Sequence, residues 1–196
     1  MPTEPSDEEV MMDYQAGHEG AFRELFERYK GRILHFCVGL LGNRADAEDV
    51  AGEVFLAVVA QRNGYHRGPK LSTWLYTIAH HKCVDRIRRR RWVMPLGGRR
   101  QALEDDEEAA WDPPSPQESA VETLARKDVA ARVRQAIVRL PVEQREAIML
   151  RQYHDCSYEQ ISEVLQCSLA KVKVLIFRGK ERLRTELVSL VKEDRP

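Results

Sequence analysis

Apolar side chains recur at intervals of three and four residues through most of this 196-residue chain, while the alternating pattern of a β-strand is nearly absent. Each amphipathic helix must bury its apolar stripe against another element, so the pattern predicts an all-α fold. The 43% apolar content is enough for one or two small domains. We expect helices within residues 22–37, 44–60, 72–92, 129–140, 142–153 and 157–187, the last range holding two helices around a tight turn.

The helical pattern is interrupted in the middle of the chain, where acidic residues and prolines gather. Such a composition is typical of a linker that cannot bury a core. Trp111 lies in it, either as a docking anchor or as a loosely packed aromatic. We therefore expect two small helical domains joined by a flexible linker. The predicted boundaries are an acidic N-terminal tail at 1–14, a first domain at 15–95, the linker at 96–122 and a second domain at 123–192.

The formal net charge of zero hides a strong separation of charge along the chain. Residues 1–20 hold six acidic side chains, residues 101–122 hold eight, and neither segment contains Lys or Arg. The rest of the chain carries all 31 basic residues but only 17 acidic ones. Two acidic segments thus mask two basic domains, which favours a polyanionic partner.

The segment 72–92 divides into two faces when it is placed on a helix. Its apolar face consists of Leu75, Ile78, Ala79, Cys83 and Ile87. The opposite face consists of Trp74, Thr77, His81, Asp85 and Arg88, and it continues into Arg89, Arg90 and Arg91. An aromatic beside guanidinium groups suits nucleic-acid bases and phosphates. A solvated helix end whose cations match the helix dipole is the alternative, and on this stretch alone both remain open.

Residues 157–187 predict a helix-turn-helix. Ser157 and Gln160 have the spacing of a capping box, and Ser168 is placed to cap the second helix. Long cations reach phosphates and guanine edges, and apolar side chains contact thymine methyl groups. An ordinary helical hairpin with a basic exposed side is the competing interpretation. The side chains expected to face a major groove are Lys171, Lys173, Val174, Phe177 and Arg178.

Several other classes of protein receive little support. The four cysteines lack close pairing, so we interpret them as reduced thiols. A metal site from His80, His81 and Cys83, or from His154 and Cys156, lacks zinc-like spacing, so we expect no metal and no cofactor. A phosphate loop and a nucleophile–base pair are missing, so we predict no catalytic activity. The longest apolar run has seven residues and the N-terminus lacks a signal-peptide core, which predicts a cytoplasmic protein without membrane insertion.

Three segments in series resemble the extracytoplasmic-function sigma factors of bacterial RNA polymerase. "AFRELFERYKGRILHFCVGLLGNRADAEDVAGEVFLAVV" resembles the start of sigma domain 2, and "STWLYTIAHHKCVDRIRRRR" resembles its promoter-melting helix. "AIVRLPVEQREAIMLRQYHDCSYEQISEVLQCSLAKVKVLIFRGKERLR" resembles sigma domain 4. The resemblance covers about 160 residues in the family's order. It implies a protein that recognises −35 and −10 promoter elements and stabilises strand opening on core polymerase.

The resemblance also implies three binding surfaces. The −10 surface would hold unpaired bases and phosphates with Lys70, Trp74, Thr77, His81, Arg88, Arg89 and Arg90. The −35 surface would read duplex DNA with Ser168, Lys171, Lys173, Val174, Phe177, Arg178 and Lys180. The polymerase surface would combine charge complementarity with a buried anchor in Asp46, Glu48, Asp49, Glu53 and Phe55.

The partners that the resemblance implies are core RNA polymerase, promoter DNA and an anti-sigma factor. The polymerase contacts would be a coiled coil of the largest subunit and the flap region. The acidic linker would either occupy a nucleic-acid path of the polymerase or act as a solvated spacer. The acidic tail is expected to shield the basic faces, so that its removal raises DNA binding. The alternative is a stand-alone helix-turn-helix regulator that binds duplex DNA without polymerase.

Six positions depart from the family pattern. Ala170 and Lys171 stand where a Gly-Thr pair is usual, and Val174 with Leu175 replaces Ser-Arg, so an unusual −35 preference is expected. His81 replaces a frequent Asn and changes the expected −10 preference. Gly52 interrupts the proposed docking helix at a cost of about 1 kcal/mol relative to Ala, which suggests close helix packing.

Overall fold

The computed structural model describes residues 4–66, 68, 70–93 and 120–193, and within these ranges it contains eight α-helices, one short 3₁₀ turn and no strand. The all-α prediction is thereby confirmed. The predicted linker, including Trp111, lies outside the described residues up to residue 119, and residues 120–122 already belong to a helix. The helices are α1 (Asp7–Gln15), α2 (Glu19–Leu41), α3 (Arg44–Ala60), α4 (Leu71–Val93), α5 (Ala120–Arg139), α6 (Val142–Gln152), α7 (Tyr158–Val164) and α8 (Leu169–Glu193).

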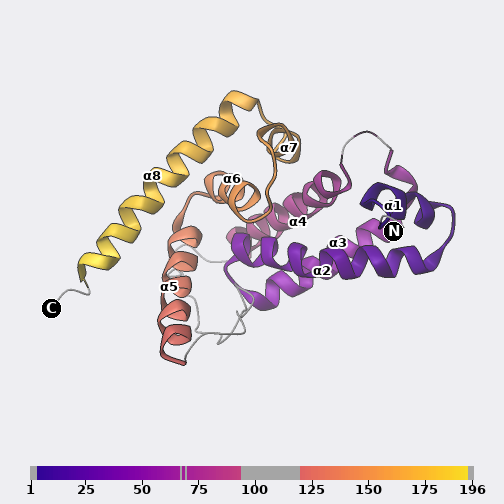
Figure 1. Cartoon of the computed structure of the whole chain (residues 1–196). Coiled ribbons are helices and arrows are strands. Elements are labelled where there is room, and N and C mark those ends of the chain that lie inside the picture. Colours follow the sequence, from indigo (N-terminus) through magenta and orange to yellow (C-terminus); the bar gives the residue numbers. More distant parts are fainter. Residues whose placement is uncertain (1–3, 67, 69, 94–119, 194–196) are drawn as a thin grey trace.

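Helices α1 to α4 form one half of the molecule and α5 to α8 the other, and we call them the N-terminal and C-terminal lobes (Figure 1). In the N-terminal lobe, α2 packs along both α3 and α4. The reversal between α2 and α3 takes two residues. Gly42 ends α2 in the left-handed conformation (φ 67°), which glycine adopts without a Cβ penalty, and the Asn43 side chain accepts a hydrogen bond from the Asp46 amide at 2.9 Å.

Helix α1 replaces most of the predicted acidic tail. Ser6 and Glu9 form a capping box at its start, and Val10, Met11 and Tyr14 are buried against the lobe. Asp7 accepts hydrogen bonds from Arg28, at 2.7 Å, and from the Tyr29 hydroxyl. The prediction of a tail is therefore wrong for residues 7–14, since their acidic side chains cap and anchor a packed helix.

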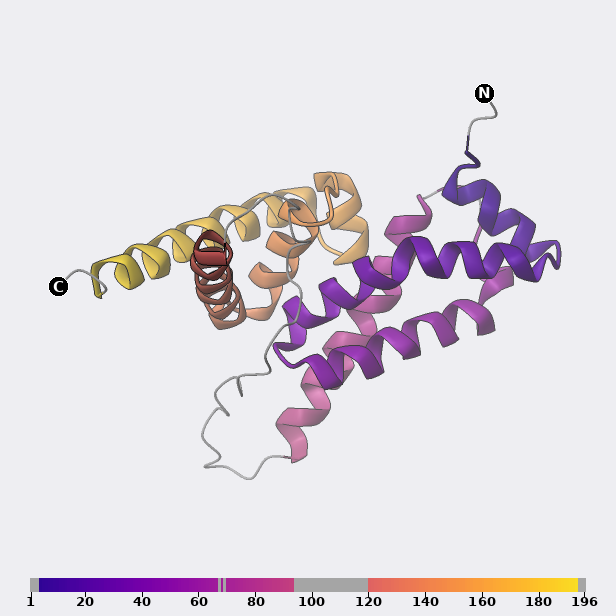
Figure 2. The same cartoon turned by 60° about the horizontal axis from the view of Figure 1, so that its bottom comes forward.

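The C-terminal lobe contains the predicted helix-turn-helix. Ser157 and Gln160 form the expected capping box of α7, and Ser168 accepts a hydrogen bond from the Lys171 amide at the start of α8. Helix α6 packs along α8, where Gly179 lets the two backbones approach closely. The far end of α8 extends beyond the rest of the lobe (Figure 2). Val172 and Ile176 of α8 are buried, whereas Val129 of α5 is exposed.

The two lobes touch through α2 and α4 on one side and through α5, α6 and α7 on the other. Gly39 of α2 lies directly against the Met149 side chain of α6. Every residue from Gln144 to Leu150 is buried, because α6 is covered by α8 from its own lobe and by α2 from the other. This contact fixes how the two predicted DNA-binding helices, α4 and α8, are placed relative to each other.

Candidate nucleic-acid interface

The predicted −10 surface lies along α4. Trp74, placed on the polar face of the helix by the sequence pattern, is half-buried. Its ring packs against the buried Tyr65 ring, with centroids 5.5 Å apart. Thr77, one turn further, is also half-buried, and its hydroxyl donates to the Thr73 carbonyl at 2.8 Å. Lys70, immediately before the helix, is exposed. The start of α4 therefore presents one partly covered aromatic side chain beside a cation.

The second half of α4 faces the acidic residues of α3. Arg86 donates to Asp46 at 2.8 Å and to Glu53 at 3.2 Å, and Arg90 forms an ion pair with Asp46. Lys82 donates to Glu53 at 3.3 Å. Partial burial raises the pKa of Glu53, but the hydrogen bonds from Lys82 and Arg86 outweigh it, and the pKa lies below its ordinary value. Asp46, Glu53 and Arg90, assigned by resemblance to binding surfaces, are thus held in ion pairs within the lobe.

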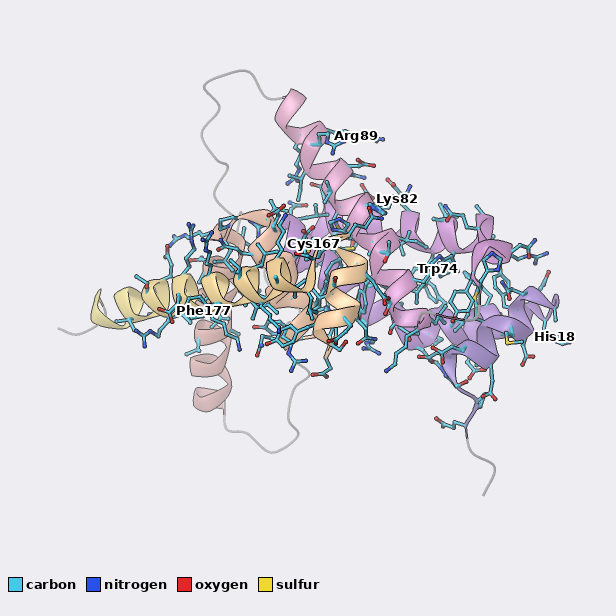
Figure 3. The ribbon with its side chains drawn as sticks, turned by 90° about the horizontal axis from the view of Figure 1, so that it is seen from above. His18, Trp74, Lys82, Arg89, Cys167 and Phe177 are labelled. Atoms are coloured by element: carbon cyan, nitrogen blue, oxygen red, sulfur yellow. The ribbon has the colours of Figure 1, made fainter. Side chains whose placement is uncertain are left out.

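The remaining polar residues of α4 stay accessible. His81 is exposed, with its ring 5.2 Å from that of His80, and Arg88 and Arg89 are exposed towards the end of the helix. Figure 3 shows Trp74, Lys82 and Arg89 following one another along α4, with Phe177 on α8 in the other lobe. The structure therefore brings Trp74, His81, Arg88 and Arg89 together on one helix, and it directs Arg90 elsewhere.

The exposed face of α3 does not include the ring of Phe55. Phe55 is only 8% exposed and packs edge-to-face on Phe26, with centroids 4.8 Å apart, so its ring is covered within the lobe. Leu56 is 70% exposed instead. Asp49 and Gly52 precede it at helical spacings of seven and four, a signal that identifies the exposed face from sequence.

Gly52 and Glu48 also belong to the exposed face of α3. Gly52 has open space around it, so the expectation that close packing explains this glycine is wrong. Glu48 is exposed and pairs with Arg44 at 2.8 Å. The exposed face of α3 thus combines accessible carboxylates, a glycine with open space beside it and an exposed aliphatic side chain.

The predicted −35 surface forms a ridge along the first turns of α8. Phe177 is 68% exposed and Val174 is 45% exposed, an unusual placement for apolar side chains. Lys171 forms an ion pair with Glu143 at 2.8 Å, and this hydrogen bond raises the pKa of Lys171. Ser168 serves as the helix cap. The cations that remain accessible along the ridge are Lys173, Arg178 and Lys180.

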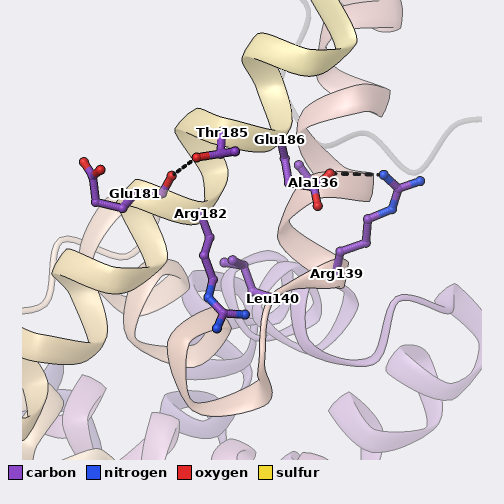
Figure 4. Close-up of a pocket in the computed structure, with 7 residues that line it drawn as sticks. All are labelled: Ala136, Arg139, Leu140, Glu181, Arg182, Thr185 and Glu186. Atoms are coloured by element: carbon purple, nitrogen blue, oxygen red, sulfur yellow. Dashed lines mark hydrogen bonds and ion pairs between the residues drawn. The ribbon is translucent and has the colours of Figure 1, made fainter.

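Leu175, which stands where the family has a polar reader, does not belong to this ridge. It is buried and lines a groove of about 510 Å³ between the lobes, together with Ile87 of α4 and Val142 of α6. A second hollow, of about 290 Å³, lies between α5 and α8, where Arg139 pairs with Glu186 at 3.2 Å (Figure 4). Leu175 thus contributes to the lobe contact rather than to a DNA-reading face.

Polar side chains that sequence reasoning missed are buried where the lobes meet. The Tyr76 hydroxyl and His154 Nδ1 lie 2.9 Å apart, and His80 Nδ1 lies 2.9 Å from Glu146 Oε1. Arg145 donates across the contact to the Leu40 carbonyl. Burial, with smaller contributions from His35 and Arg32, lowers the pKa of His154 to about 3. Nothing in the local spacing marks these side chains as buried.

The alternative metal sites receive no geometric support. His80 faces Glu146, His81 faces solvent, and Cys83 is buried beside Cys37, whose hydrogen bond, together with burial, raises the pKa of the Cys83 thiol. The described part of the chain contains no group of three or more His, Cys, Asp or Glu side chains arranged to hold a metal ion. In the same residues, no helix has the length and apolar character needed to cross a membrane.

Comparison with known proteins yields two family matches. Residues 25–93 match the model of sigma-70 region 2, and residues 130–183 match that of sigma-70 region 4. The ECF RNA polymerase sigma factor SigW of Bacillus subtilis is 30% identical over 177 residues, covering 89% of this chain and 92% of SigW. The RNA polymerase sigma-H factor of Pseudomonas aeruginosa is 30% identical over 196 residues, covering 98% of this chain and all of that protein.

Solved structures agree on the fold. The sigma factor RpoE of Bartonella quintana, in complex with the anti-sigma factor NepR, superposes with a TM-score of 0.64 at 22% identity, covering 89% of this chain and 98% of RpoE. CnrH, in complex with the cytosolic domain of CnrY, superposes with a TM-score of 0.66 at 21% identity, covering 97% of this chain and all of CnrH. The region 2 and region 4 matches, in their expected order, and the 30% identity to the ECF sigma factor SigW place the chain in the extracytoplasmic-function group of RNA polymerase sigma factors.

Proposed function

We propose that this chain gives core RNA polymerase its promoter specificity through two separate DNA-binding helices. The observation that carries the proposal is the exposed ridge of α8, where Phe177 and Val174 stand among the cations Lys173 and Arg178 on a capped helix-turn-helix. An apolar pair flanked by cations fits a major groove rather than solvent. The −10 helix α4 supplies a second such surface in the other lobe.

At the −35 element, the ridge of α8 enters the major groove. Arg178 reaches a guanine edge or a phosphate, and Phe177 and Val174 contact thymine methyl groups. Lys173 and Lys180 bind phosphates, which adds affinity without sequence preference. Lys171 must first exchange its ion pair with Glu143 for a phosphate, and since that pair is exposed, the exchange costs little. Ser168 acts through the helix cap.

At the −10 element, α4 holds the opened strand. A flipped base loses a few kcal/mol of stacking, which an aromatic platform offsets. Trp74, supported from behind by Tyr65, offers such a platform, and His81 lies two turns further along the same helix. Lys70, Arg88 and Arg89 bind the phosphates, and Thr77 borders the platform. Arg90 instead neutralises Asp46 and thereby fixes α4 on α3.

The exposed face of α3 docks on the polymerase. Asp49 and Glu48 supply the charge complementarity, and Leu56 takes the anchoring role predicted for Phe55. Gly52 lets the partner approach the helix backbone closely. We accordingly assign polymerase docking and −10 binding to the domain at 15–95, extended by α1, and −35 binding to the domain at 123–192.

The partners follow from this division of roles. Core polymerase, through the largest-subunit coiled coil and the flap region, and promoter DNA engage the three surfaces described above. An anti-sigma factor is proposed as the regulator, because RpoE and CnrH, which share this fold, were solved with an anti-sigma factor and with the cytosolic domain of CnrY. The relatives' names favour the sigma factor over the stand-alone regulator.

Reconstituted transcription tests the proposal. Core enzyme plus the chain is expected to initiate at discrete sites in a genomic library, and mapped start sites then define both elements. Arg178→Ala should lower initiation about tenfold or more at −35-dependent promoters, the size of one lost guanine contact. Arg184→Ala, an equally exposed cation further along α8, is the matched control and should be near neutral. Equal losses from both variants, or sequence-specific duplex binding without core enzyme, would contradict the proposal.

A further inference from the structure

Helix α1 reaches across the N-terminal lobe to both ends of the connection that leads into α4. At one end, Gln15 Nε2 donates to the carbonyls of Arg62, at 2.6 Å, and Tyr65, at 2.8 Å. At the other end, Glu8 Oε1 accepts from the Leu71 amide at 3.0 Å. These three hydrogen bonds span 47 to 63 residues of sequence, so they define tertiary geometry rather than local turns.

The chemistry of the Gln15 contact is unambiguous. Both partners are backbone carbonyls, which only accept, so the amide must present its NH₂ group to them. A carboxylate at this position would face two acceptors without a proton to share. The guanidinium of Arg62 also lies over the Tyr14 ring of α1, 5.6 Å from its centroid. The segment before α4 is therefore held by a specific set of polar and aromatic contacts.

Glu8 caps the start of α4 from outside the helix. The first four amides of a helix have no partner within it, and the first turn of α4 contains no acidic residue. The Glu8 carboxylate, arriving from α1, accepts from the first of these amides and matches the positive end of the helix dipole. The position at which α4 begins is thus set from outside the helix.

Trp74 is connected to both anchored points. Its amide donates to the Lys70 carbonyl in the first turn of α4, so the position of Trp74 along the helix axis depends on where the helix starts. Its ring leans on Tyr65, whose backbone Gln15 holds. A shift at either anchor moves the aromatic pair.

We propose that α1 positions the −10 surface: Glu8 and Gln15 are positioning residues that hold the Tyr65–Trp74 aromatic pair in the geometry that captures an unpaired promoter base. This inference rests on the −10 role proposed above for α4. It assigns α1 to promoter opening and leaves polymerase docking to α3.

The test combines protein and promoter substitutions. Gln15→Glu removes the donor with little change in shape, and Ala16→Glu places the same charge on the next, exposed residue as the matched control. Each protein is assayed with core enzyme on the mapped promoter, on a version with one substituted −10 base and on one with a substituted −35 base. Two lost hydrogen bonds should lower initiation by Gln15→Glu about tenfold, while Ala16→Glu stays near wild type.

The decisive readout is additivity. If α1 positions the −10 surface, the −10 base substitution costs several-fold less in Gln15→Glu than in wild type, whereas the −35 substitution costs the same in both. Glu8→Ala should reproduce this pattern, and Glu8→Gln, which keeps an acceptor, should restore most of the activity. Additive losses with both elements, or equal effects of Gln15→Glu and Ala16→Glu, would overturn the inference. Absence of element-dependent initiation by the wild-type chain would instead overturn the proposed function itself.

Discussion

The interiors of the two lobes and the contact between them differ in the polar side chains that they bury. Inside the lobes, the fully buried positions are mainly apolar, as at Ile33, Leu40 and Phe36. Between the lobes, the buried groups include His154 and Glu146, which are hydrogen-bonded to partners from the other lobe. Apolar burial contributes most of the stability of a domain, whereas buried polar pairs lose much of their attraction to desolvation. The contact therefore defines one arrangement of the lobes more than it stabilises them.

The difference fits a protein that must open. Two DNA-binding helices that engage separate promoter elements need lobes that fold independently and separate at little cost. The polar part of the contact meets this need, because its side chains bind water once the lobes separate and are costly only when they are left buried and unpaired. Substitutions in the lobe interiors, in the contact and on the surface should therefore differ in their effects.

A truncation in the interior should have the largest effect. Ile33→Ala leaves a cavity in the fully buried core of the N-terminal lobe and should lower the free energy of unfolding by about 3 kcal/mol. Urea denaturation followed by circular dichroism measures it. Val59→Ala, on the exposed side of α3, is the control and should change stability by less than about 0.5 kcal/mol. Similar losses for both variants would refute the assigned interior.

Acidification should weaken the contact between the lobes. Because the pKa of His154 is about 3 in the closed arrangement, below its ordinary value of 6.5, the separated or unfolded state binds the proton first. Stability conferred by this group is complete above about pH 7 and is lost as the pH falls towards 3, with about 2 kcal/mol lost by pH 5.

Energy transfer between labels on α3 and α8 at pH 7.5 and pH 5 measures this separation directly. Charged and titratable neighbours that face His154 are Arg32 and His35 of α2 and Tyr76 of α4. His154→Phe keeps a ring of similar shape and should flatten the pH dependence. An unchanged pH profile in this variant would show that another group controls the contact.

Alanine at three helical glycines should act in three different ways. At Gly179 a Cβ would lie 2.8 Å from Ile148 Cγ1 inside the C-terminal lobe, and the substitution should cost about 1 kcal/mol of unfolding free energy. At Gly39 the Cβ would overlap Sδ and Cε of Met149 in the other lobe, the flexible end of a side chain that can shift, so Gly39→Ala should weaken the contact between the lobes slightly without unfolding either. At Gly52, which has open space, alanine should stabilise α3 by up to about 1 kcal/mol. Equal unfolding midpoints for all three would contradict the account.

Loss of an exposed ion pair should have the smallest effect on stability. Lys171→Ala breaks the pair with Glu143 on the surface of the C-terminal lobe, and exposed pairs contribute little. The urea midpoint should be unchanged within error, while promoter binding by the holoenzyme should lose some of its salt dependence. A clear drop in the urea midpoint would show that the Lys171–Glu143 pair stabilises the fold, contrary to this prediction.

Helical spacing predicted the features that depend on the local sequence of one helix. The buried face of α4, the caps Ser157 and Ser168, and the buried positions Val172 and Ile176 follow from local pattern, and the structure confirms them. Helix α1 was also predictable in principle, since Ser6 and Glu9 have capping-box spacing before an apolar run. The high acidic content of this segment suggested a tail instead.

Contacts between elements decided the rest. The sequence of α6 places Gln144, Arg145 and Glu146 in succession, a polar run that predicts solvent exposure, yet α8 and the N-terminal lobe cover it. The acidic residues of α3 are typical of a docking surface, but Asp46 and Glu53 form ion pairs with cations of α4. Partner choice of this kind depends on how helices are placed side by side, which periodicity within one helix does not encode.

Strand opening at a promoter can be measured with permanganate. Permanganate modifies unpaired thymines, so it can be applied to a mapped promoter with core enzyme, with this chain alone and with both together. The account predicts reactive thymines between the −10 element and the start site only when both are present, and their loss in Trp74→Ala. Reactive thymines with core enzyme alone, or full opening by the Trp74→Ala protein, would contradict it.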